Sequence, residues 1–108
     1  MNVYDEAHDL ARAIKESNEF IEFDKVRKEV EADKESSEMI AELQKLQMEF
    51  QASQMTGQPD DQMLGRIQSL STMIATKPLA ARYLQAQGAF SIMMNDVFTI
   101  IGESIGLK

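Results

Sequence analysis

The sequence predicts an all-α protein of about five helices, and three observations lead to that prediction. Apolar residues recur at alternating spacings of three and four along most of the 108 residues, which is the period of one helix face. Breaks at residues 56–60 and at Lys77-Pro78 divide the second half into segments of helix length. No segment alternates polar and apolar residues between turn signals, as a strand would. The length fits a single helical domain over residues 1–108.

The first two helices are expected at about residues 3–16 and 19–32. Asn2 is the expected N-cap of the first, because its short polar side chain can accept a hydrogen bond from the first helical turn. The second carries charges of both signs around its apolar side, which is typical of a solvated helix. The apolar members are Val3, Ala7, Leu10 and Ile14 in the first helix, and Phe20, Phe23, Val26 and Val30 in the second.

The third and fourth helices are expected at about residues 34–55 and 60–76, as an antiparallel hairpin. Asp33 is the expected cap of the third helix and Asp60 of the fourth. The connection contains Gly57 and Pro59 and is short, which favours antiparallel neighbours. The apolar faces comprise Met39, Leu43, Leu46 and Phe50 in one helix, and Met63, Ile67, Leu70 and Ile74 in the other.

A long apolar helix is expected from Pro78 to the C-terminal end, at about residues 78–107. Between Tyr83 and Ile101 its only formal charge is Asp96. Its apolar positions cover roughly 200° of the circumference, where a one-sided surface helix needs about 100°. We therefore expect this helix to be the most buried one, with the third and fourth helices covering its centre and one edge. Gly88 indicates a close helix approach or a bend, because glycine inside a helix is otherwise unfavourable.

The other edge of the long helix is the predicted interface with a second copy of the chain. A two-fold dimer is the commonest way to cover such a stripe, because the same residues then meet each other. The opposite edge, from Met93 to Ile100, is the alternative. Residues 102–106 are expected to be a fraying helix end. The predicted interface comprises Leu84, Met94, Phe98, Ile101 and Ile105.

Composition and charge exclude several classes of partner. The net charge of −7 lies on residues 1–54, which hold 14 acidic and 7 basic residues, so we expect burial mainly in the second half. Without clustered Lys and Arg, direct binding to nucleic acid is not expected. No apolar run reaches the length of a membrane span, and there is no cysteine, which fits a cytoplasmic protein.

No catalytic, metal or cofactor site is predicted. His8 is the only histidine, and one histidine without cysteine cannot complete a zinc site. Carboxylate pairs such as Glu31 with Glu35 would need partners from another helix to bind a cation. A non-catalytic interaction protein is therefore the first interpretation. The alternatives are a direct RNA-binding module and, third, an enzyme that uses carboxylates gathered at an oligomer interface.

The order of these segments resembles the YlbF/YmcA family of small helical bacterial proteins, and most closely its YheA-like branch. The resemblance covers the whole chain and is strongest in the block that contains Pro78, Tyr83, Leu84 and Ala86, with the apolar helix that follows. The other matching segments are DLARAIKES, NEFIEFDKVRKEVEADKE and MIAELQKLQMEFQASQ.

The resemblance implies an all-α cytoplasmic protein that oligomerises and acts through protein contacts. Its better-known members are adaptors that assemble with one another and influence RNA processing, competence, sporulation and biofilm formation. Some of those assemblies are linked to iron–sulfur clusters. This chain departs from them, because without cysteine it cannot ligate a cluster in the usual way. The expected protein is a self-associating adaptor, with a dimer as first choice and further protein partners as a second possibility.

Overall fold

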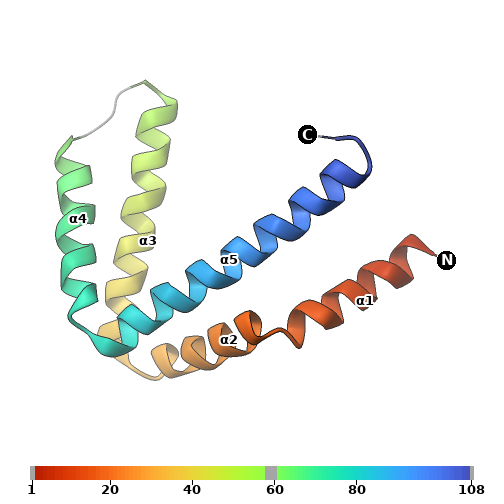
Figure 1. Cartoon of the computed structure of the whole chain (residues 1–108). Coiled ribbons are helices and arrows are strands. Elements are labelled where there is room, and N and C mark those ends of the chain that lie inside the picture. The colour runs from red at the N-terminus through yellow and green to blue at the C-terminus, as the bar shows by residue number, and fades with distance from the viewer. Residues whose placement is uncertain (1, 58–60, 108) are drawn as a thin grey trace. The chain divides into compact units, whose positions relative to one another are not determined.

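The computed structural model describes residues 2–57 and 61–107, and it contains five helices in that part of the chain and no strand (Figure 1). The helices are α1 (Val3–Lys15), α2 (Asn18–Glu31), α3 (Lys34–Met55), α4 (Asp61–Ala75) and α5 (Pro78–Ser104). The all-α prediction is confirmed, and each helix begins and ends within three residues of its expected position. The predicted cap Asp60 lies outside the described residues.

Short-range capping explains most of these boundaries. The backbone N–H of Tyr4 donates to Oδ1 of Asn2 at 2.8 Å, so the predicted N-cap of α1 is confirmed. Asp33 occupies the N-cap position of α3, but its carboxylate makes no capping bond to the backbone. It accepts instead from the hydroxyl of Ser36 at 2.6 Å, which provides a partner for the one buried polar side chain among the described residues.

The contacts divide the chain into two compact units. The first consists of residues 1–27 and 83–108 and the second of residues 28–82, so α2 and α5 each contribute to both. The expectation of one domain over residues 1–108 stays a prediction.

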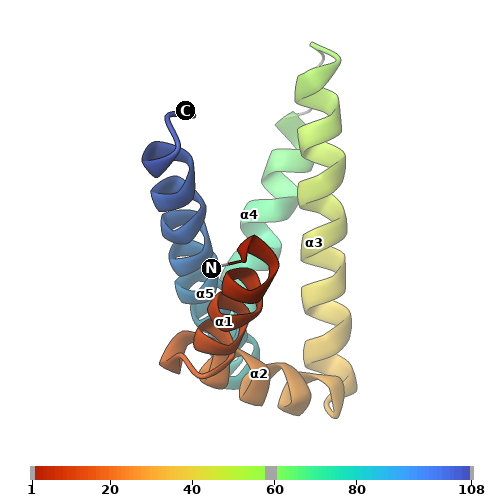
Figure 2. The ribbon, with the colours of Figure 1, turned by 90° about the vertical axis from the view of Figure 1, so that its right-hand side faces the viewer.

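In the second unit, α3 and α4 pack against each other as the predicted antiparallel hairpin (Figures 1 and 2). Gly57 ends α3 with a φ of 78°, a conformation that favours glycine. The buried residues of this unit are Val30, Ser36, Ile40, Leu43, Leu46, Ile74 and Ala80.

Ion pairs link segments that are distant in sequence on the surface of the second unit. Nζ of Lys77 lies 2.5 Å from Oε1 of Glu35, and Arg82 lies 3.4 Å from Glu29. The hydrogen bond and the charge of Glu35, with a smaller contribution from Asp33, raise the pKa of Lys77 above its ordinary value. Both side chains of this pair are about half exposed, so water and salt weaken the interaction.

Two expectations about burial are wrong for the single chain. Residues before position 54 supply more than half of the buried core, although they carry the whole net charge. The long helix α5 is not the most buried element. Only Ala80, Tyr83 and Ala86 of α5 are buried, whereas Phe98 and Ile100 in its second half are each 64% exposed.

Ile74 is fully buried, so we expect its truncation to lower the free energy of unfolding by about 2–5 kcal/mol in Ile74→Ala. Urea denaturation followed by circular dichroism, at one fixed protein concentration, measures the effect. Met73→Ala is the matched control, because Met73 is 58% exposed on the adjacent position. Equal losses of unfolding free energy in Ile74→Ala and Met73→Ala would show that Ile74 does not lie in the core.

The pair of Lys77 and Glu35 predicts a pH dependence in the alkaline range. Because the pKa of Lys77 is raised in the folded chain, its contribution to stability is fully present below the ordinary lysine pKa. It is lost as the pH rises through the higher pKa of the folded state. Urea midpoints of the wild type and of Lys77→Gln should therefore differ at neutral pH and converge above that pKa. A difference that persists there would contradict the assignment.

Candidate protein-interaction surface

The first unit is built around aromatic side chains from α2 and α5. The rings of Phe23 and Phe90 stack with centroids 5.5 Å apart and an interplanar angle of 9°. Phe20 also contacts Phe90, and Phe23 contacts Tyr83, each at 5.6 Å. We expected α3 and α4 to cover the centre of α5, but the rings packed on Tyr83 and Phe90 come from α2. These contacts fix the first half of α5 against α2.

The predicted interface residues lie along α5 from this ring cluster outward. Leu84 and Met94 are half-buried. Phe98, Ile101 and Ile105 are 64%, 43% and 64% exposed. The exposed part of the predicted stripe is therefore its C-terminal end, and it continues the face that Phe90 presents to α2.

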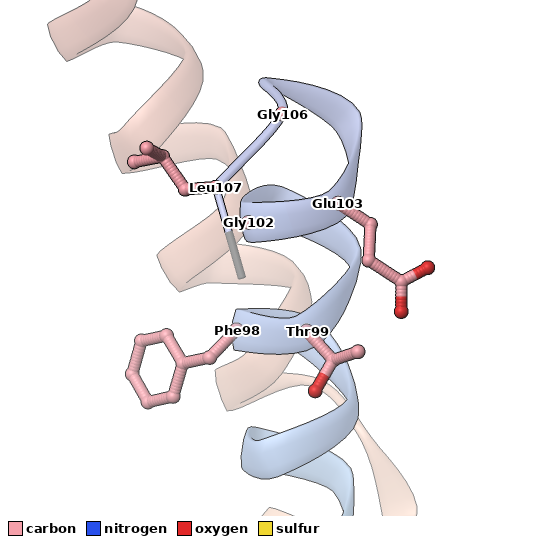
Figure 3. Close-up of a pocket in the computed structure, with 6 residues that line it drawn as sticks. All are labelled: Phe98, Thr99, Gly102, Glu103, Gly106 and Leu107. Carbon is pink, nitrogen blue, oxygen red and sulfur yellow. The ribbon is translucent and has the colours of Figure 1, made fainter.

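Exposure alone does not choose between the two edges of α5. Phe98 on the predicted edge and Ile100 on the alternative edge are equally exposed. The Phe98 edge differs because Ile101 and Ile105 extend it and because it borders a hollow at the end of the helix. The volume of this hollow is about 650 Å³, and its lining comprises Phe98, Thr99, Gly102, Glu103, Gly106 and Leu107 (Figure 3).

The end of α5 is a closed cap, so the expectation of a fraying end is wrong. Gly106 has a φ of 82°, and its N–H donates to the carbonyl of Glu103 at 3.2 Å. The N–H of Leu107 donates to the carbonyl of Gly102 at 2.7 Å. This pair of bonds is a Schellman motif, and it turns Leu107 back beside the last turn of α5. Figure 3 shows Leu107 and Phe98 on the same side of the helix.

A side chain at Gly102 would occupy the notch of this cap. A Cβ there would lie 3.3 Å from the carbonyl oxygen of Leu107, which is tighter than an ordinary contact. Gly88 is different, because a Cβ at that position would meet nothing within 4 Å. The expected close helix approach at Gly88 is therefore not found within the chain.

Sequence reasoning assigned no site to α1, which carries a second exposed apolar face. None of its residues is buried, and Val3 and Tyr4 are 81% and 77% exposed. Its spacing of four, three and four was visible in the sequence. That signal predicted the helix but not what covers its apolar face, because periodicity does not say which segment packs on it.

The described residues offer little for catalysis or metal binding. No group of three or more His, Asp or Glu side chains in residues 2–57 and 61–107 is placed to hold a metal ion. His8 is exposed on α1. A second hollow of about 630 Å³ lies on the α3–α4 hairpin, where Leu46, Leu70 and Met73 line it together with Glu42 and Arg66. No helix in the described residues is long and apolar enough to cross a membrane.

The fold and this surface define a small all-α protein whose apolar helix faces on α1 and α5 are exposed. The chain belongs to the YlbF/YmcA family, because the family described as control of competence regulator ComK, YlbF/YmcA, matches residues 3–106. The family resemblance is thereby confirmed, and the YheA-like branch stays a prediction.

Relatives in other bacteria carry the description UPF0342 protein. One from Desulfitobacterium hafniense is 38% identical over 97% of this chain and 86% of its own length. One from Caldicellulosiruptor saccharolyticus is 32% identical over 99% of this chain and 90% of its own length.

Two solved structures share the fold. A protein of unknown function (DUF964) from Bacillus stearothermophilus matches with a TM-score of 0.83 and 20% identity, over 96% of this chain and 92% of that one. A chain in the crystal structure of Bacillus subtilis RicA in complex with RicF matches with a TM-score of 0.62 and 18% identity, over 96% and 93% of the two chains.

Gly106→Ala is expected to open the cap at the end of α5, because a left-handed conformation costs a residue with a Cβ about 1–2 kcal/mol. Hydrogen exchange at the amide of Leu107, which donates to Gly102 in the cap, measures the opening. Gly88→Ala is the control and should leave this amide unchanged while it stabilises α5 by about 1 kcal/mol. Unchanged exchange in Gly106→Ala would show that the cap does not hold Leu107.

Proposed function

We propose that this chain is a non-catalytic helical adaptor that forms a dimer through the C-terminal half of α5 and acts through protein–protein contacts. The observation that carries the proposal is the exposed stripe of Phe98, Ile101 and Ile105. Burying large apolar side chains is the main favourable term in protein association, and patches of this kind mark interfaces. The interface is proposed to include Leu84 and Met94, which are half-buried at the inner end of the same stripe.

The family supports a regulatory role. Its description names control of a competence regulator, and one similar structure holds RicA in complex with RicF. Both facts favour a cytoplasmic protein that binds other proteins in a bacterial regulatory process. The resemblance adds RNA processing, sporulation and biofilm formation as the processes in which such adaptors act.

The non-catalytic part of the proposal rests on the family and on the exposed apolar faces. His8 is exposed on α1, and no group of three or more His, Asp or Glu side chains in residues 2–57 and 61–107 is placed to hold a metal ion. The C-terminal half of α5, in contrast, resembles the core of an interface, where charged residues are depleted.

Phe98→Glu tests the dimer directly. The variant places one carboxylate from each chain inside the proposed interface, where burial of a charge is unfavourable. The mass measured by light scattering should therefore fall from that of a dimer to that of a single chain. Circular dichroism should remain helical, since Phe98 is already 64% exposed in the single chain. Gln85→Glu is the control, because it introduces the same charge at an exposed position on the opposite side of α5.

The outcomes separate the two edges. A wild type that is monomeric at micromolar concentration refutes self-association. A Phe98→Glu variant that stays dimeric, together with an Ile100→Glu variant that becomes monomeric, moves the interface to the alternative edge of α5.

A further inference from the structure

The helix α1 has an apolar face that its own chain leaves exposed. Val3, Ala7, Leu10 and Ile14 follow a spacing of four, three and four, and Asp5, Asp9 and Arg12 lie on the other side of the helix. Arg12 pairs there with Asp9. The chain covers the apolar face only in part, because Ile14 at the inner end is half-buried and Leu10 is 38% exposed. A helix of 13 residues is marginal in water alone, so this face requires a partner.

The joint between α1 and α2 holds α1 away from α5. The hydroxyl of Ser17 donates to the carbonyl of Ile14 at 2.6 Å and accepts from the N–H of Phe20 at 3.1 Å. The N–H of Ser17 also donates to Ile14, and the carbonyl of Ser17 accepts from Ile21. The joint thus satisfies the ends of both helices with short local bonds. In Figure 1, α1 and α5 diverge toward the two termini, so the cover for both faces must come from elsewhere.

The exposed area matches what a stable dimer needs. On α1 the large exposed residues are Val3, Tyr4 and Leu10, and on the Phe98 edge of α5 and its cap they are Phe98, Ile101, Ile105 and Leu107. With roughly 150–250 Å² for an aromatic side chain and somewhat less for an aliphatic one, their exposed parts amount to on the order of 800 Å². A specific interface removes about 800 Å² from each partner. About half of the area lies on each helix, so the Phe98 edge of α5 alone falls short.

We infer that the occupant of both faces is a second copy of this chain, with α1 and the C-terminal half of α5 from each copy forming a four-helix bundle around a two-fold axis. In such a bundle, each α1 packs against the α5 of its partner, and the same two stripes are covered on both copies. This inference rests on the proposed dimer and adds α1 as the second half of its interface.

The hollow at the end of α5 fits this arrangement. Phe98 and Leu107 flank Gly102, which lacks a side chain, so the hollow can receive a large side chain from a facing helix. The first turn of α1 carries Tyr4, whose ring is 77% exposed and whose hydroxyl can remain near the polar rim formed by Thr99 and Glu103.

Leu10→Glu tests the role of α1 while α5 stays unchanged. The dimer dissociation constant, measured by sedimentation equilibrium on the full chain, should rise at least about tenfold, because each copy loses a buried leucine and gains a charge. His8→Glu is the matched control, since it introduces the same charge on the polar face of α1, and it should leave the dissociation constant within about twofold of the wild type.

A cross-link identifies the partner helix even where Leu10→Glu unfolds α1. The chain has no cysteine, so a Tyr4→Cys chain and a differently tagged Phe98→Cys chain can be co-expressed and oxidised. A disulfide between the two tagged chains supports the bundle, because only α1 of one copy against α5 of the other brings these positions together. Disulfides formed only between two Phe98→Cys chains overturn it.

The two proposals fail in different ways. If Leu10→Glu keeps the dissociation constant of the wild type while Phe98→Glu becomes monomeric, α1 lies outside the interface and the dimer through α5 stands. If the wild type itself is monomeric at micromolar concentration, both the dimer and the bundle are refuted.

Discussion

The stacking of Phe23 on Phe90 is the contact on which the first unit depends. Tyr83 and Phe20 extend it, so a few rings from α2 and α5 take the place of a broad core. The rings position α5 against α2, and the Ser17 joint then sets the direction of α1. Because aromatic rings bury a large area per residue, α2 can hold α5 although its other faces are charged.

The lengths of the helices explain why apolar surface remains beyond the rings. The 27 residues of α5 extend about 40 Å, whereas the 14 residues of α2 extend about 21 Å. The second half of α5 therefore runs past the end of α2 and keeps its apolar sequence. The 13 residues of α1 would nearly match that remainder, but the joint leads α1 away from it. The same geometry leaves two apolar helices without a cover in one chain.

The sequence predicted the helices well because their limits are local events. Asn2, Gly57 and Pro78 act through bonds or sterics within one turn, so no knowledge of the packing was needed. Burial was predicted less well. Ile40 is buried although it lies beside the expected face of α3, and the most apolar helix is exposed at Phe98. The width of the apolar face indicates how much of a helix surface must be packed against other segments. Whether that face is buried depends on which segments of the chain pack on it. Of the proposed interface, the sequence indicated Phe98, Ile101 and Ile105, but not α1 or the cap that turns Leu107 back.

A closed assembly covers these faces more completely than an open one. Asp96 lies on the side of α5 away from Phe98, and Asp5, Asp9 and Arg12 lie opposite the apolar face of α1. An open chain of copies, in which α1 of each copy packs on α5 of the next, would leave one apolar face bare at each end. A closed two-fold arrangement covers both apolar faces and leaves both charged faces in water. In the proposed dimer, the net charge of −7 on each chain would keep separate dimers apart.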